Sequence, residues 1–259
     1  MRKKIFYVFS FIGLILWIAA GCSRQVVNLR EMTPEDQFAY AKKIYDRGNY
    51  DKARMQFAMV AMNNPGSVIS DKTQFYLADS HYHLKEYIQA IAEFERLIRS
   101  LPQSPYVDDA RYKIGMCYFR LSPGYALDQE YTYKAISQFE QFLDEHPDSE
   151  LRLEVEKRIH ESREKLAKKE FKTAELYRKM GYIRAAVISY ENVTREFTNS
   201  SFCAEAYYRK GECLLRMGES DEAETSFETL IRRFPDSTLA GQAERRLETI
   251  RASRKSGTE

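Results

Sequence analysis

One sequence pattern recurs five times along the 259 residues of this chain. An alanine is followed four residues later by an aromatic residue, and in four copies a proline comes eight residues after that. The five alanines are Ala53, Ala90, Ala135, Ala186 and Ala223. Each is preceded by a turn, such as RGNY at 47–50, and by an earlier helical segment. Repetition of this kind predicts a stack of similar helix pairs.

The pattern resembles tetratricopeptide repeats, in which small residues let two helices approach and aromatic residues fill the space between them. The earlier helical segments carry small residues in equivalent places, namely Ala41, Ala78, Gly115, Ala174 and Gly211. The resemblance covers residues 33–237 and implies an all-α solenoid of five helix pairs. Four apolar residues then keep helical spacing and predict a C-terminal capping helix: Leu239, Ala243, Leu247 and Ile250. Residues 253–259 are expected to form a flexible tail.

Two insertions make the spacing of the repeats uneven, with successive alanines 37, 45, 51 and 37 residues apart. The first insertion is a loop rich in turn-forming residues in repeat 3, SPGYALDQEY at 122–131. The second adds fourteen residues without Gly or Pro, which is close to four helical turns. We therefore predict one long helix over 150–180. It divides the array into repeats 1–3 at 34–148 and, at 149–252, repeats 4–5 with the capping helix.

The N-terminal residues 1–21 have the layout of a secretory signal peptide. Three basic residues at 2–4 precede sixteen uncharged residues, fewer than the roughly 20 that a membrane-spanning helix needs. The junction AAGC at 19–22 resembles the bacterial lipobox, in which the leader is removed in front of a lipid-modified cysteine. An uncleaved N-terminal helix with an incidental cysteine is the alternative interpretation.

The lipobox resemblance implies that Cys22 carries a covalent lipid and that residues 22–33 form a lipidated tether. Two or more acyl chains suffice for stable anchoring. Ser23 stands where an aspartate would, by the enterobacterial sorting rule, retain a lipoprotein in the inner membrane. The resemblance therefore implies a protein anchored by lipid to the periplasmic face of the outer membrane.

Composition argues against nucleic-acid binding and against catalysis. Without residues 1–21 the chain has 37 basic and 38 acidic residues, so it lacks the basic surplus of a nucleic-acid-binding protein. No P-loop, dinucleotide fingerprint or metal-ligand spacing is present, and the four histidines are scattered. We therefore predict a binding protein and not an enzyme, with no catalytic residues, no metal and no cofactor apart from the lipid on Cys22.

Three further cysteines fit packing better than chemistry. Cys117 and Cys213 occupy equivalent places in repeats 3 and 5, where tetratricopeptide repeats favour small buried residues. Cys203 and Cys213 would lie about 15 Å apart on one helix, beyond the reach of a disulfide. Cys203 has no such equivalent place. A thiol-active periplasmic enzyme that uses Cys203 is therefore kept as an alternative.

The first helix of each pair lines the concave surface in tetratricopeptide proteins. In repeats 1–3 this helix carries two aromatic residues seven apart, which places both on one face. These residues are Phe38, Tyr45, Phe75, Tyr82, Tyr112 and Phe119. They predict a groove for an extended client peptide with aromatic side chains. Packing between neighbouring helices is the alternative explanation of the same residues.

The corresponding surface becomes charged in repeats 4 and 5. Its residues there include Glu175, Arg178, Lys179, Glu212 and Arg216. Packing does not require this change from aromatic to charged residues. A charged groove suits a specific protein partner, so we predict that repeats 4 and 5 bind one.

A lipoprotein tether followed by five such repeats resembles the BamD (YfiO/ComL) family of the β-barrel assembly machinery. The more specific similarities are Asp128-Gln129 at the end of the inserted loop, Pro147-Asp148-Ser149 after it, and REKLAKKEF at 163–171. The resemblance implies a protein that binds the periplasmic domains of the BamA-like barrel insertase. It also implies binding of unfolded outer-membrane β-barrel proteins through their C-terminal, aromatic-ended strand. A different tetratricopeptide lipoprotein, one that scaffolds cell-wall or polysaccharide machinery, is the alternative.

Overall fold

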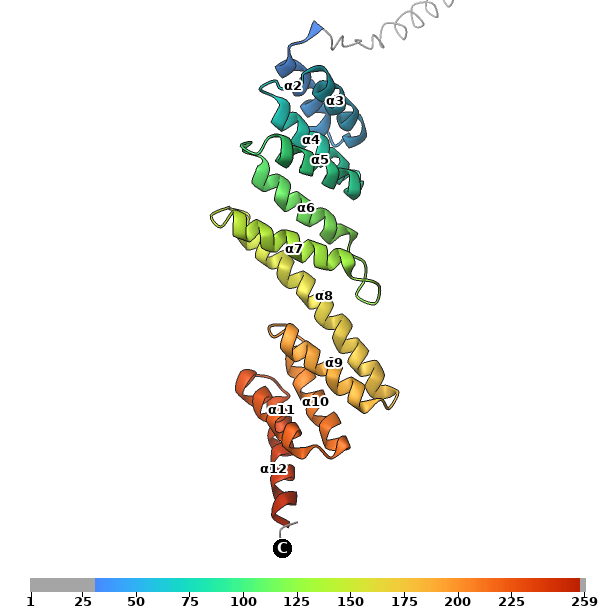
Figure 1. Cartoon of the computed structure of the whole chain (residues 1–259), viewed down its shortest axis with the longest axis vertical. Helices are drawn as coiled ribbons and strands as arrows, with labels where there is room; N and C mark the ends of the chain where they lie inside the picture. Colours follow the sequence, from blue (N-terminus) through green and yellow to red (C-terminus); the bar gives the residue numbers. More distant parts are fainter. Residues whose placement is uncertain (1–30, 257–259) are drawn as a thin grey trace, which may run out of the picture.

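The computed structural model describes residues 31–256, and within that range it contains eleven α-helices and no strand. Figure 1 shows the helices stacked one after another into an elongated array. In chain order the helices are α2 Pro34–Asp46, α3 Tyr50–Asn63, α4 Ser70–His83, α5 Tyr87–Ser100, α6 Val107–Leu121, α7 Glu130–Glu145, α8 Arg152–Lys179, α9 Ile183–Glu196, α10 Cys203–Met217, α11 Ser220–Arg233 and α12 Ala240–Ser256. The predicted all-α solenoid of five pairs and a capping helix is confirmed.

The helix pairs are held together by small residues that face aromatic rings. Ala41, Ala78 and Ala174 are fully buried at the position predicted for the close approach. At Gly115 a Cβ atom would lie 2.5 Å from the buried ring of Phe139. At Gly211 it would lie 2.6 Å from the ring of Phe227. The aromatic residue of each second helix therefore occupies the space that a larger side chain on the first helix would need.

The turns inside the pairs need a left-handed backbone conformation. Gly48, Gly181 and Gly218 supply it with φ values of 75°, 84° and 82°, which cost glycine little because it has no Cβ. In the second pair Lys85 occupies the corresponding place with φ 63°. The turn can therefore form without glycine, at the cost of some backbone strain.

The long central helix is confirmed: α8 runs without interruption for 28 residues. The two insertions seen in the sequence lie against each other. The Lys165 ammonium donates to Ser122 Oγ at 2.7 Å, and Lys169 donates to the Leu127 carbonyl at 2.7 Å. The Lys168 Nζ lies 4.7 Å from the ring centroid of Tyr125. The inserted loop of repeat 3 therefore braces the segment by which α8 is lengthened.

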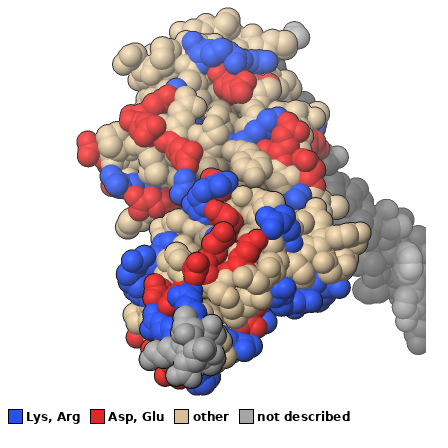
Figure 2. Space-filling view, turned by 60° about the horizontal axis from the view of Figure 1, so that its bottom comes forward, with Lys and Arg blue, Asp and Glu red and all other residues tan. Residues whose placement is uncertain are grey.

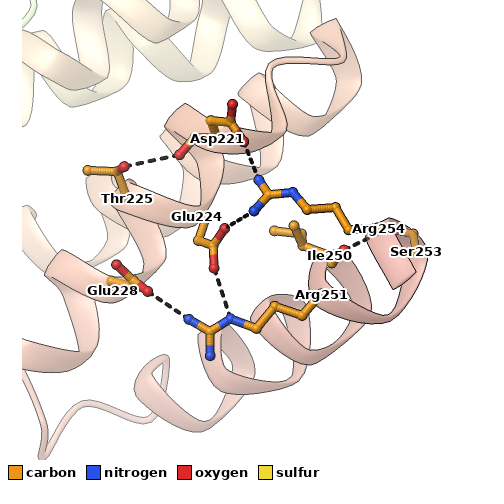
Figure 3. A network of polar contacts seen from close by, with 8 residues as sticks. All are labelled: Asp221, Glu224, Thr225, Glu228, Ile250, Arg251, Ser253 and Arg254. Carbon is orange, nitrogen blue, oxygen red and sulfur yellow. Dashed lines mark hydrogen bonds and ion pairs between the residues drawn. The ribbon is translucent and has the colours of Figure 1, made fainter. Parts of the chain in front are cut away.

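The capping helix α12 is attached to α11 by apolar contacts and by the ion pairs drawn in Figure 3. Ala243, Leu247 and Ile250 are buried in the C-terminal core. Arg251 pairs with Glu224 and Glu228 at 2.8 and 2.7 Å, and Arg254 pairs with Glu224 and Asp221. These arginines reach back to α11 from the last turns. The helix continues to Ser256, beyond residue 253 where we expected a flexible tail to begin.

No helix between residues 31 and 256 is both long and apolar enough to cross a membrane. The predicted signal peptide at 1–21, the lipidation of Cys22 and most of the tether at 22–33 lie outside the described residues. Those assignments remain predictions.

Candidate binding surfaces of the two halves

The six predicted groove residues form a half-buried surface along repeats 1–3. Phe75 is only 8 % exposed, whereas Phe38, Tyr45, Tyr82, Tyr112 and Phe119 are all of intermediate exposure. Several rings contact each other across repeats: the centroids of Tyr45 and Tyr76 are 5.1 Å apart, and those of Phe38 and Tyr76 are 5.8 Å apart. The rings therefore pack neighbouring helices and also keep exposed area on the surface. We call these six residues the N-terminal groove.

Cations lie over the rings of the N-terminal groove. The spacing of residues along the sequence does not predict these contacts. Lys72 Nζ is 4.7 Å from the centroid of Phe38, and Lys113 Nζ is 4.6 Å from that of Tyr82. Phe119 has two such neighbours, Arg158 at 5.4 Å and Lys165 at 5.7 Å. Contacts within about 6 Å are attractive because the ring face is electronegative. Lys113 and Arg158 are paired with carboxylates, so the positive charge available to a ligand comes chiefly from Lys72 and Lys165.

A buried carboxylate joins the first three repeats beneath these cations. Asp79 on α4 is 5 % exposed. It accepts hydrogen bonds from the Tyr45 hydroxyl on α2 and from Lys113 Nζ on α6, the latter at 2.7 Å. Burial, followed by the bond to Asp79, raises the pKa of Tyr45, so this hydroxyl stays protonated. Asp79 thereby links the groove residue Tyr45 of repeat 1 to Lys113 of repeat 3.

The charged surface of repeats 4 and 5 is largely paired within the chain. Arg178 donates two hydrogen bonds to the Glu175 carboxylate at 3.1 and 3.0 Å, and the Tyr190 hydroxyl donates a third. The bonds from Arg178, opposed by burial, lower the pKa of Glu175 to about 2. Glu212 accepts a bond from Arg246 of the capping helix at 3.0 Å. Glu175, Arg178 and Glu212 therefore stabilise the fold.

Replacing Glu175 with glutamine should lower the free energy of unfolding by about 1–2 kcal/mol at pH 7. The effect is no larger because solvent partly screens the attraction between Glu175 and Arg178. The folded pKa of about 2 lies below the ordinary 4.5. The stabilisation is therefore complete above pH 4.5 and disappears as the pH falls toward 2. Urea titrations between pH 3 and 7 should show the curves of wild type and variant converging in acid. The exposed Glu222→Gln should show no such convergence. A difference independent of pH would contradict this interpretation of the pair.

Lys179 and Arg216 are the two predicted partner-binding residues that stay accessible. Both are exposed, and no ion pair or hydrogen bond of either is found in the described part of the chain. Figure 2 shows Lys and Arg interspersed with Asp and Glu over the C-terminal end, with no large patch of one sign on that face. A partner would therefore be recognised by individual charges and not by a broad field.

The structure contradicts the use of Cys203 as a reactive thiol. Cys117, Cys203 and Cys213 are all fully buried and none is in a disulfide. Burial raises the pKa of the Cys203 thiol, and it raises that of Cys117 to about 12. Since the thiolate is the reactive form, a buried thiol with a raised pKa is a poor nucleophile. In residues 31–256 no group of three or more His, Cys, Asp and Glu side chains could hold a metal ion.

Known proteins similar to this chain include two relatives in sequence and one solved structure. The chain is 28% identical to the "Outer membrane protein assembly factor BamD" of Caulobacter vibrioides over 78% of its length and 68% of the relative's. It is 24% identical to the protein of the same name from Rickettsia prowazekii, over 64% of its length and 66% of the relative's. Among solved structures, the chain is similar to the TPR2AB domain of yeast Sti1 in complex with pHSP90, with 16% identity and a TM-score of 0.46. The similarity covers 86% of this chain and 84% of the Sti1 chain.

The match to a family model extends over most of the repeat array. The model is YfiO, described as "Outer membrane lipoprotein", and it matches residues 30–226, from before α2 into the first half of α11. The matched region covers both the N-terminal groove and the charged residues of repeats 4 and 5. The chain belongs to the YfiO family of outer membrane lipoproteins.

Proposed function

We propose that this protein is an assembly factor for outer-membrane proteins. It is held at the periplasmic face of the outer membrane by the lipid on Cys22, binds unfolded β-barrel proteins, and presents them to the barrel insertase. Membership of the YfiO family and similarity to two BamD proteins support this role. The mechanism is binding: repeats 1–3 hold the client and repeats 4–5 hold the insertase.

The observation that carries the client assignment is the N-terminal groove, where exposed ring area and positive charge occur together over three repeats. An extended, aromatic-ended C-terminal strand offers aromatic side chains for the rings and a terminal carboxylate for Lys72, whereas Lys113 is already paired with Asp79. Asp79 prevents the first three repeats from moving independently. A rigid groove binds an unfolded chain at a lower entropic cost, since only the client has to be ordered.

Replacing Tyr45 and Tyr82 together with alanine should weaken binding of a C-terminal barrel-protein peptide by at least about tenfold. Each ring removed costs on the order of 1–2 kcal/mol, and about 1.4 kcal/mol is tenfold in affinity. Fluorescence anisotropy of the labelled peptide measures the change. Tyr45→Phe with Tyr82→Phe keeps both rings but removes the hydroxyls, including the one that donates to Asp79, so it separates loss of ring contact from loss of that bond. Unchanged affinity in a folded alanine variant would show that the aromatic residues only pack helices.

Repeats 4 and 5 are proposed to hold the periplasmic domains of the insertase through Lys179 and Arg216. Lys179→Glu with Arg216→Glu should reduce co-purification of the insertase, because like charges brought together at an interface cost several kcal/mol. The client peptide should bind this variant normally. Arg178 is unsuited to the test because its reversal would set two carboxylates beside each other at Glu175. If insertase and client binding fall together in the folded variant, the two-site division is wrong.

The anchor is tested separately. Cys22→Ser should leave the precursor uncut and absent from the outer-membrane fraction, because the acyl chains provide the membrane affinity. Fractionation and mass measurement of the mature protein report both effects. A variant that is still processed and still sediments with outer membranes would refute lipidation at Cys22 while leaving the binding proposals untouched.

A further inference from the structure

The long helix α8 has a face that is covered in the other repeats and open here. In a regular array the first helix of a pair packs against the second helix of the preceding pair. In repeat 2 this face carries Thr73, Leu77 and Ser80, which are 0 %, 6 % and 0 % exposed. In repeat 3 it carries Ala110, Ile114 and Cys117, which are 0 %, 3 % and 0 % exposed. Leu77 lies in the same apolar cluster as Ala53 and Phe57 of α3.

The equivalent residues of repeat 4 are Lys169, Thr173, Leu176 and, one turn on, Met180. Leu176 and Met180 are each 56 % exposed, although Cys213, which corresponds to Leu176 in repeat 5, is fully buried. The fourteen-residue insertion explains the difference. It displaces α7 along α8, so that α7 packs on the beginning of α8 and α9 on its end, as Figure 1 shows. We call Leu176, Met180, Lys172 and Lys179 the open face.

The chemistry of the open face limits what can cover it. Leu176 and Met180 form an apolar ridge one turn long. Lys172 and Lys179 flank it, are exposed, and make no ion pair in the part of the chain that the structure describes. The inserted loop ends above it, where Lys169 donates to the Leu127 carbonyl at 2.7 Å. A hollow of about 550 Å³, lined in part by Tyr133, Leu166 and Lys169, lies before the open face along α8. Large apolar side chains left exposed among polar ones are typical of interaction sites.

We propose that the open face binds an amphipathic α-helix of a partner protein, with apolar residues set against Leu176 and Met180 and carboxylates set against Lys172 and Lys179. A helix is favoured over a strand because a helix covers this same face in repeats 2, 3 and 5. The partner helix would substitute for the second helix of a missing preceding repeat. The open face is on α8, whereas the N-terminal groove is formed by α2, α4 and α6. The inference concerns the chemistry of the bound helix and does not depend on which protein supplies it.

The first test uses a designed probe with the full-length protein. The probe is a helical peptide of about four turns with leucines along one face and flanking glutamates, and its partner peptide has lysines in place of the glutamates. The acidic peptide should bind at least about tenfold more tightly than the basic one, because like charges at an interface are strongly unfavourable. Equal affinities, or no binding of either peptide, would overturn the proposal.

Two variants locate the binding on α8. Leu176→Glu with Met180→Glu should weaken acidic-peptide binding at least about tenfold. Leu153→Glu is the matched control, because Leu153 is 77 % exposed and lies 23 residues before Leu176 on the same helix, about 34 Å along its axis. Lys172→Glu with Lys179→Glu should reverse the preference toward the basic peptide. Loss of binding in the control, or an unchanged preference after charge reversal, would overturn the proposal.

A photo-reactive amino acid at position 176 identifies the natural occupant in living cells. We expect a cross-link to another protein, at a helix that carries acidic residues. A synthetic peptide of that helix should bind the wild type and should bind the Leu176→Glu, Met180→Glu variant more weakly. A cross-link to a second copy of this chain, to lipid, or to an extended client segment would overturn the assignment. The client-peptide titration is unaffected by any of these results. Lys179 belongs both to the open face and to the proposed insertase contact, so insertase co-purification is also measured with Leu176→Glu, Met180→Glu, which keeps Lys179 and Arg216. Loss of acidic-peptide binding with normal co-purification in that variant tells the two proposals apart.

Discussion

Lys165→Pro should lower the free energy of unfolding by roughly 3 kcal/mol or more, because proline removes a helical hydrogen bond and its ring clashes with the preceding turn. Lys165 lies near the middle of α8, the helix whose beginning packs on α7 of repeat 3 and whose end packs on α9 of repeat 4. The substitution also removes the bond from Lys165 to Ser122 at 2.7 Å. Breaking α8 there should loosen the coupling between repeats 1–3 and repeats 4–5.

Urea unfolding followed by circular dichroism measures this effect. The wild type should unfold in one transition, whereas the proline variant should show two, since each half retains its own core. Lys165→Ala is the control: it keeps the helix and loses only the side-chain bond, so about 1 kcal/mol or less is expected. If the proline and alanine variants unfold alike, α8 does not couple the halves.

The repeats and the long helix could be predicted because they follow from local sequence. The alanine and the aromatic residue four positions later lie on one helix face, so their recurrence directly indicates which faces pack. The absence of Gly and Pro over residues 149–171 likewise predicts continuous helix. The contact between the two insertions could not be predicted from local sequence, because it joins Lys165 to Ser122, which are 43 positions apart.

The candidate surfaces were predicted less completely, for two different reasons. The cation over Phe38 comes from Lys72 on another helix, and no spacing rule within one helix reveals such a neighbour. The pairing of Glu175 with Arg178 has the three-residue spacing of neighbours on a helix, so this internal pair could have been recognised from sequence. The open face could not be predicted from the sequence, because it depends on the displacement of α7 along α8. The exposure of Leu176 is recognised as unusual only when the burial of equivalent positions in different repeats is compared.

Gly115→Ala should lower the free energy of unfolding by about 2 kcal/mol, although alanine is the better helix former by about 1 kcal/mol. The added Cβ would lie 2.5 Å from Phe139 Cε1 and 2.6 Å from Cδ1. Phe139 is fully buried, so its ring can move aside only by displacing its neighbours in the core. Gly241→Ala in α12 is the control, because its Cβ would meet nothing within 4 Å and should be neutral or stabilising.

A double-mutant cycle decides whether the ring is the cause. Phe139→Leu removes Cε1 and Cζ, two of the three ring atoms that the Cβ would meet, so adding Gly115→Ala to that variant should cost clearly less than adding it to the wild type. Thermal and urea unfolding of the four proteins give the coupling energy. If Gly115→Ala costs the same in both backgrounds, the close approach of α6 and α7 does not depend on Phe139. The same geometry recurs at Gly211, where a Cβ would lie 2.6 Å from Phe227. A positive coupling at Gly115 therefore predicts one at Gly211, and the small residue facing an aromatic ring would then be a general requirement of these helix pairs.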